Sequence, residues 1–248
     1  MLYLCLQPLL LGCSYSTSNE KIPTHCNIFD PVVTDLGICY SFNAEPVTSM
    51  LTKSSFKNAF QEVYQFDLNE SPIELAKGAG DNFALKFLVY NHRYQKAASE
   101  TKPFKTLISS QRGYFDALSV SKEVKFGFET TYDVLPTEVK GTRELQSMLE
   151  EKRKCRFSDE VHKKDRLFKT YSQSSCEFEC RVHKAREECK CTPWNFPTPP
   201  SITNPIICDL YGNFCFHKKM RNVQVIGNCT NGICPSDCED IRLNAAWS

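Results

Sequence analysis

The sequence predicts an α+β fold, with a strand-rich first part followed by a helical part that disulfide bonds hold together. Three observations lead to this prediction. Short apolar runs before Gly141 alternate with a period of two, as in strands that bury one face. After Gly141 the apolar spacing becomes helical. Ten of the 14 cysteines then fall between Cys155 and Cys238, a pattern typical of disulfide-stapled modules.

The strand-rich part contains three segments that carry this prediction. Residues 37–43 read Gly-Ile-Cys-Tyr-Ser-Phe-Asn and are β-like in composition. Residues 83–89 and 124–128 alternate apolar positions with the residues between them, which predicts strands with one buried face. Pro103 and Pro136 interrupt this region and indicate turns or edge strands.

Two helices and one loop are expected after Gly141. Leu145, Met148 and Leu149 have helical spacing, which predicts a short amphipathic helix that continues to about residue 154. A second helix is expected over about 170–188. The Pro-rich segment 192–205 can only form an extended loop. We interpret its tryptophan as an aromatic that packs beneath the loop.

The composition limits the class of protein. The chain has 248 residues, of which 41% are hydrophobic and 24% charged, as in a globular protein with a core. The formal net charge of +1 gives no overall field, so we expect no nucleic-acid partner. No stretch approaches the roughly 18 apolar residues of a membrane span. The apolar opening, residues 1–12, contains Pro8 and has no preceding Lys or Arg, so we interpret it as part of a folded domain.

The cysteines indicate an oxidising compartment. Four lie in the first 39 residues, none lies between Tyr40 and Lys154, and ten follow. A cytosolic chain rarely carries so many thiols without a metal. Two Asn-x-Ser/Thr sequons, at Asn69 and Asn228, are glycosylation candidates and agree with an extracellular location.

Cysteines that are close in the sequence are poor partners for one another. Cys189 and Cys191 would close a strained ring, and Cys176 and Cys180 point along one helix face. We expect the helix pair to cross to the tail cysteines, and the following pair to cross the Pro-rich loop. The tail cysteines are Cys229, Cys234 and Cys238, and those beyond the loop are Cys208 and Cys215. We expect such a ladder to need little hydrophobic core.

A structural zinc site is the competing interpretation of the cysteines. Such sites favour paired C-x2-C knuckles, which this sequence lacks. The histidines form no H-x3–5-H pair, and they are His25, His92, His162, His183 and His217. We therefore expect no metal ion and no other cofactor.

Two blocks of sequence resemble the degenerin/epithelial sodium channel family, including its insect pickpocket-like members. The first is TDLGICYSFN at 34–43, which carries the motif residues Tyr40, Phe42 and Asn43. The second comprises KCRFSDE, YSQSSCEFECRVHKAREECKCTPWNFP, ICDLYGNFCF and CTNGICPSDCE, and carries the motif residues Tyr171 and Pro193. Residues 45–140 match only weakly, and the family prefers a small or polar residue where Glu179 stands.

The resemblance implies a division of the chain and a pairing of its cysteines. Residues 1–154 correspond to a partial finger, a palm and a β-ball of mixed β-sheet, 155–238 to a disulfide-rich helical thumb, and 239–248 to the start of the returning palm strand. The implied thumb pairs are Cys155–Cys238, Cys176–Cys234, Cys180–Cys229, Cys189–Cys215 and Cys191–Cys208.

The resemblance also bears on the first four cysteines. Cys13 and Cys26 resemble a pair in the finger of the family. The family partner of Cys39 lies just after the first membrane helix, in sequence that is absent here. Cys5 could replace it only if the fold rearranged, so we expect one or both of Cys5 and Cys39 to be unpaired.

The function implied by the resemblance is extracellular gating in a subunit of an amiloride-sensitive-type sodium channel. The full-length subunit would lie in the plasma membrane, assemble with other subunits as a trimer and respond to an unknown extracellular ligand. Sodium ions would cross only through pore helices that this sequence lacks, so we interpret the chain as a fragment of such a subunit. The alternative is a secreted, disulfide-rich binding or decoy protein derived from the same ectodomain.

An enzyme is the weakest interpretation. The sequence contains no G-x-S-x-G, no H-E-x-x-H and no phosphate-binding loop. The cysteines are too many and too clustered to single out one nucleophile beside a histidine.

Overall fold

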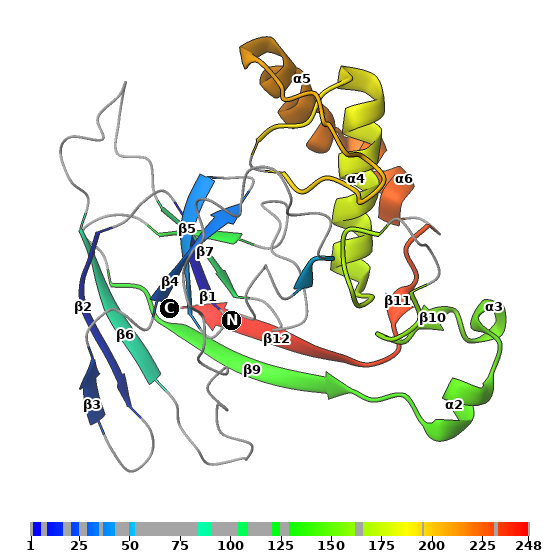
Figure 1. Cartoon of the computed structure of the whole chain (residues 1–248). Helices are drawn as coiled ribbons and strands as arrows, with labels where there is room; N and C mark the ends of the chain where they lie inside the picture. The colour runs from blue at the N-terminus through cyan, green and yellow to red at the C-terminus, as the bar shows by residue number, and fades with distance from the viewer. Residues whose placement is uncertain are drawn as a thin grey trace.

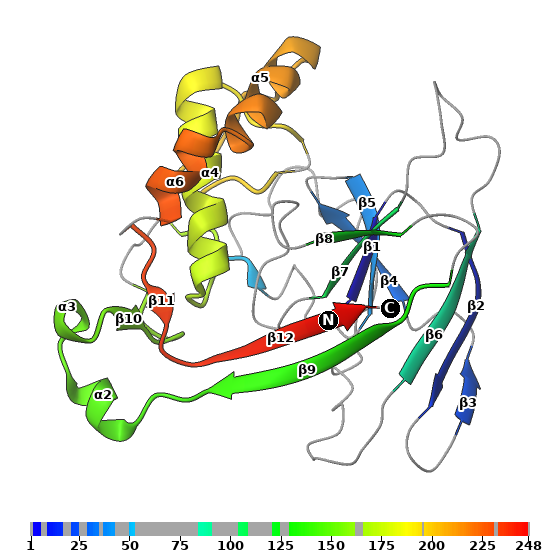
Figure 2. The same ribbon diagram turned by 180° about the vertical axis from the view of Figure 1, so that it is seen from behind.

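The structure is a computed structural model with a strand-rich body and a helical arm, residues 155–238, that stands beside it (Figure 1, Figure 2). It describes the following residues: 2–5, 9–16, 21–24, 29–34, 37–42, 50–52, 84–90, 104–108, 121–124, 129–161, 166–194, 196–230 and 233–247. The mixture of sheets, helices and disulfides confirms the predicted α+β class.

The largest sheet of the body has five antiparallel strands in the order β4-β5-β1-β7-β8. The strands are β1 Leu2–Cys5, β4 Phe29–Thr34, β5 Gly37–Phe42, β7 Phe104–Ile108 and β8 Ser121–Val124. Phe29 and Phe42 are buried, and their ring centroids are 5.7 Å apart. β5 confirms the strand predicted at 37–43, whereas the alternating residues 125–128 lie outside the described part of the chain.

A second sheet has three antiparallel strands in the order β3-β2-β6. They are β2 Leu9–Ser16, β3 Lys21–Thr24 and β6 Ala84–Tyr90. β6 confirms the strand predicted at 83–89. β2 shows that the apolar opening of the chain continues into a strand of the body.

A long ribbon of two antiparallel strands connects the body with the arm (Figure 1). It consists of β9, Tyr132–Val139, and β12, Asp240–Trp247, paired over eight residues each. Pro136 is exposed in β9 and lies opposite Leu243, as expected for proline in an edge strand. β9 leads into the arm and β12 returns from it.

The helix predicted over 145–154 is two short helices, α2 Arg143–Ser147 and α3 Glu150–Arg153. Met148 between them has extended backbone, and the side chains of Met148 and Leu149 are 44% and 69% exposed. A continuous helix would have no apolar surface to pack against here, and short helices are marginal without such packing. Lys154 adopts the left-handed conformation and ends α3.

Three longer helices form the arm. α4 is Gln173–Cys189, close to the predicted 170–188, and it begins after Ser172 because the Ser172 hydroxyl accepts a hydrogen bond from the Ser175 N–H. α5 is Leu210–Met220, capped by Asp209, and α6 is Val223–Thr230. A short parallel pairing of β10, Cys155–Arg156, with β11, Ser236–Asp237, closes the base of the arm.

The arm contains a hydrophobic core, so the expectation that it would need little core is wrong. The Phe178 and Phe196 rings are stacked with centroids 5.9 Å apart, and the Phe216 ring meets Phe196 edge-on at 4.9 Å. The interpretation of Trp194 is also wrong, because Trp194 is 52% exposed and Phe196 is the aromatic beneath the loop. Residues 192–205 form the expected loop.

Candidate functional site

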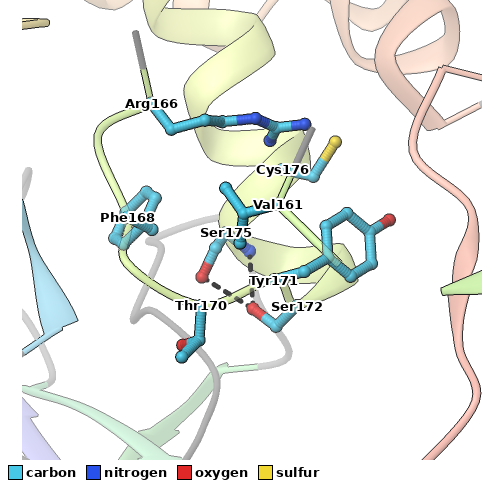
Figure 3. Close-up of a pocket in the computed structure, with 8 residues that line it drawn as sticks. All are labelled: Val161, Arg166, Phe168, Thr170, Tyr171, Ser172, Ser175 and Cys176. Atoms are coloured by element: carbon cyan, nitrogen blue, oxygen red, sulfur yellow. Dashed lines mark hydrogen bonds between the residues drawn. The ribbon is translucent and has the colours of Figure 1, made fainter. Parts of the chain in front are cut away.

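A small hollow lies in the arm, among residues that the structure describes. The hollow beside the first turn of α4 is too small to admit a water molecule (Figure 3). Ser172 and Ser175 line it, and their hydroxyls are hydrogen-bonded to each other. Across the described ranges no three His, Cys, Asp or Glu side chains lie together to hold a metal ion. The candidate site is therefore the arm as a mechanical unit.

The ten cysteines of the arm form five disulfides. They are Cys155–Cys238, Cys176–Cys234, Cys180–Cys229, Cys189–Cys215 and Cys191–Cys208, with Cα–Cα distances between 5.0 and 6.0 Å. These are the same five pairs that the resemblance implies. Each bond encloses the next, so the outgoing half of the arm, 155–191, is joined to the returning half, 208–238, at five successive levels.

The nesting determines how the bonds act. On the chain-entropy model a bond that closes 17 residues, as Cys191–Cys208 does, stabilises by about 3 kcal/mol. The outermost bond spans 83 residues, but the bonds inside it already close most of that loop. Each bond therefore adds a similar, local constraint, and together they hold the two halves in register along the length of the arm.

Tyr171 links the start of α4 to the returning half at the base of the arm. Its hydroxyl donates a hydrogen bond to the Pro235 carbonyl, and its ring lies 4.6 Å beneath the Arg156 guanidinium. Burial raises the pKa of Tyr171, so the hydroxyl stays protonated as the donor. The Arg156 Nε also donates to Glu150 at 2.7 Å. This family-motif tyrosine thus has a structural role at the junction.

Asp237 provides a second link at the same end of α4. The Gln173 backbone N–H donates to both Asp237 carboxylate oxygens, at 3.0 and 3.2 Å. A carboxylate is favourable at a helix N-terminus because the first N–H groups lack partners within the helix. The base of the arm is therefore held both by the adjacent Cys155–Cys238 disulfide and by these polar contacts.

A pair of charged residues ties α3 to the turn that follows β10. The Arg153 side chain is only 2% exposed and forms an ion pair with Glu160. It also donates through Nε to the Cys155 carbonyl at 2.9 Å and lies over the Phe157 ring. Glu160 accepts in addition from the Phe157 N–H at 2.9 Å. These contacts fix the approach of the chain to the first arm disulfide.

Glu179, which departs from the family pattern, is buried but well partnered. One carboxylate oxygen accepts from the Arg166 guanidinium at 3.0 Å, and the other accepts from the Leu167 backbone N–H at 3.0 Å. A buried carboxylate is tolerated when it is paired and hydrogen-bonded. The residue therefore fastens the segment before α4 to the middle of that helix.

A short segment outside the arm, residues 50–52, is attached to it. The Thr52 N–H donates to the Leu167 carbonyl at 2.8 Å, and the Lys169 N–H donates to the Met50 carbonyl at 2.9 Å. Met50 and Leu51 are buried in the same cluster as the arm phenylalanines. This attachment could not be predicted from the sequence, because nothing in the local pattern of 50–52 distinguishes it from a loop.

The far end of the arm carries exposed apolar side chains that the sequence analysis did not identify. Leu210, Tyr211 and Phe214 on α5 are 81%, 85% and 72% exposed, and Ile206 is 71% exposed. α5 lies at the end of the arm away from the β9–β12 ribbon (Figure 1, Figure 2). The spacing of these residues alone cannot separate an exposed face from a buried one.

The remaining expected site residues lie in the body or on α6. Cys13 and Cys39 are disulfide-bonded, so Cys39 is not an unpaired thiol. In the backbone register of β1 with β5, position 5 lies opposite Cys39. Phe42 is buried, Tyr40 is half-buried, and Pro193 is fully buried. Asn228 is exposed on α6. The others lie outside the described residues: Cys26, Asn43 and Asn69.

Comparison with known proteins shows which sequences this chain is similar to. A family model described as amiloride-sensitive sodium channel matches residues 2–248. Sodium channel protein Nach of Drosophila melanogaster is 25% identical over 223 residues, which is 90% of this chain and 41% of that protein. Pickpocket protein 28 of the same species is 22% identical over 270 residues, 98% of this chain and 42% of that protein.

A third relative matches a shorter part of this chain. Sodium channel protein Nach of Drosophila ananassae is 28% identical over 155 residues, which is 62% of this chain and 29% of that protein. This chain thus spans less than half the length of these curated relatives. None of the helices in its described part is both long and apolar enough to span a bilayer.

Proposed function

This chain belongs to the amiloride-sensitive sodium channel family, and we propose that it forms the extracellular gating domain of a sodium channel subunit. The family match confirms the resemblance of the two motif blocks. In this proposal the full-length subunit lies in the plasma membrane and assembles with other subunits as a trimer. Sodium ions cross through membrane segments of that subunit, and the stimulus is an extracellular ligand.

The observation that carries the proposal is the nested set of five disulfides in an arm that is continuous with the β9–β12 ribbon. A gating element has to pass a displacement on, and a soft element would absorb it. The disulfides prevent the two halves of the arm from sliding. Cys238 is followed almost directly by Asp240, the first residue of β12, so movement of the arm base moves the ribbon.

The attachment at 50–52 supplies the fixed point that such a lever requires. Two backbone hydrogen bonds and the shared core hold the segment before α4 against residues 50–52. The ribbon leaves the arm at its base, and the exposed apolar end of α5 lies beyond the attachment. A force on the far end would therefore turn the arm about this point and shift β9 and β12 together.

Recording sodium current from oocytes that express the full-length subunit tests the proposal. Replacing Cys155 and Cys238 together with serine loosens the base without leaving a free thiol. We expect a loss of most of the stimulated, amiloride-blocked current, at unchanged surface labelling. The matched control replaces Cys191 and Cys208, the innermost bond, and should retain more of the current.

Two outcomes would count against the gating role. Normal current from the Cys155→Ser, Cys238→Ser subunit would show that the base bond transmits nothing. A secreted product of this chain, with no current from any longer transcript, would favour the alternative of a binding or decoy protein derived from the ectodomain.

A further inference from the structure

The sequon Asn228-Cys229-Thr230 has an unusual setting, because it lies in the last turn of a helix and its middle residue is a disulfide cysteine. Asn228 is exposed on α6, whereas Cys229 is 0% exposed and bonded to Cys180. The Thr230 hydroxyl donates to the carbonyls of Ile226 and Gly227, each at 3.2 Å.

This folded geometry is unsuited to glycan transfer. An N-x-S/T acceptor is expected in a surface loop, not in a helix. Residues at i and i+2 of a helix do not face each other. The hydroxyl of Thr230 is also occupied by the helix backbone, and Cys229 is held inside the arm. A transferase therefore needs this segment before α6 forms.

The folded arm can nevertheless carry a glycan at this position. Asn228 is exposed, and a Cβ atom added at neighbouring Gly227 would meet nothing within 4 Å, so the surface beside Asn228 is open. An asparagine-linked glycan is bulky and belongs on such a surface. The structure thus accepts the product of the reaction while blocking the reaction itself.

We propose that Asn228 is an N-glycosylation site whose modification competes with formation of the Cys180–Cys229 disulfide. In the transfer, Asn228 Nδ2 bonds to the anomeric carbon of an oligosaccharide carried on a lipid pyrophosphate. The lipid pyrophosphate leaves with the bonding electron pair, and a base takes the amide proton. In the competing step a disulfide oxidant of the secretory compartment takes two electrons from the Cys180 and Cys229 thiols, which release two protons.

The order of synthesis makes this competition close. Cys180 precedes Cys229 by 49 residues, so it has already entered the compartment when the sequon arrives. Synthesis adds about 5–20 residues per second, and disulfides form in seconds to hours. Disulfide formation can thus begin within the seconds in which the residues after the sequon are synthesised, so we expect partial occupancy of Asn228 in the native chain.

The inference relies on the extracellular location proposed above, and the experiment separates the two. The whole chain is expressed behind a secretion leader, and Asn228 occupancy is measured by mass spectrometry after enzymatic deglycosylation in heavy-oxygen water. Cys180→Ser keeps the sequon intact but removes the partner of Cys229, so occupancy should rise from partial to nearly complete. Cys189→Ser breaks a different arm disulfide and should leave occupancy unchanged. Reductant during pulse labelling should raise the occupancy of the native chain.

Each outcome of this experiment contradicts a specific part of the inference. Equal occupancy in the native chain and in Cys180→Ser would overturn the competition, and absence of a glycan from both would overturn the site. Disulfide mapping of the same samples shows whether the chain reached an oxidising compartment. Oxidised arm cysteines without a glycan at Asn228 would refute this inference alone, because surface labelling of the full-length subunit tests the extracellular location separately.

Discussion

Gly141 lies between β9 and α2, where the chain passes closest to the ring of a buried phenylalanine. A Cβ atom at this position would lie 2.9 Å from two ring carbons of Phe157 and 3.4 Å from the Cys238 carbonyl oxygen. Phe157 is only 5% exposed and has little room to move. At the residue scale, the junction of ribbon and arm therefore depends on the absence of a side chain.

We expect Gly141→Ala to destabilise the protein by about 1–3 kcal/mol, the usual cost of overpacking a core. The free energy of unfolding in denaturant measures the change. Gly227→Ala is the matched control, because a Cβ there meets nothing and alanine favours a helix by up to about 1 kcal/mol. A Gly141→Ala protein as stable as the native chain would show that Phe157 yields at no cost.

The Glu179–Arg166 pair is a second test at this scale. Glu179→Ala would leave the largely buried Arg166 guanidinium without its carboxylate and the Leu167 N–H without its acceptor. Breaking a buried pair in this way costs about 3–5 kcal/mol. We expect the double variant Arg166→Met, Glu179→Met to lose less than Glu179→Ala does. Equal losses in denaturant unfolding would mean that the pair is not coupled.

At the scale of elements, the sequence predicts the features that depend on local patterns and misses those that depend on packing. β5, β6 and α4 were predicted because alternation and helical spacing are local. The division into α2 and α3 was not, because it depends on the absence of a surface for Met148 and Leu149 to pack against. Individual disulfide pairs came only from the family resemblance, since spacing left the tail cysteines interchangeable.

The packing of α5 gives a pH-dependent prediction. The His217 ring lies 5.7 Å from the Phe196 ring, and burial lowers the pKa of His217, with a further contribution from Arg221. The unfolded chain therefore binds the proton more readily than the folded one. Stability should be complete above about pH 6.5, the ordinary histidine value, and fall as the pH decreases below it.

Unfolding of the native chain and of His217→Phe at pH 7 and pH 5 measures this effect. The native chain should lose stability between these values, and the variant should lose less, because phenylalanine keeps the ring contact and cannot be protonated. His183→Gln, at an exposed position of α4, is the control and should behave as the native chain does. A variant that keeps the full pH dependence would assign it to other groups.

At the scale of the whole molecule, the described residues join the arm to the rest of the chain in three places. Two are the ribbon strands β9 and β12, and the third is the segment 50–52. The polar contacts of Tyr171 and Asp237 lie at the base, beside the bond that separates arm from ribbon. The effect of losing a disulfide on the ribbon should therefore depend on the position of that bond in the nested series, and less on the length of chain that it spans.

This gives the last prediction. Replacing Cys155 and Cys238 with serine, or Cys191 and Cys208 with serine, should reduce stability by a similar amount, about 3 kcal/mol, because the nested bonds leave each with a short loop to close. The two variants should differ in which part of the structure becomes looser. Hydrogen exchange of the β12 amides should accelerate when the base bond is lost and stay unchanged when the innermost bond is lost, since only the base bond adjoins the ribbon. Equal acceleration in both variants would mean that the arm loosens as one body and that the base bond has no special part in moving the ribbon.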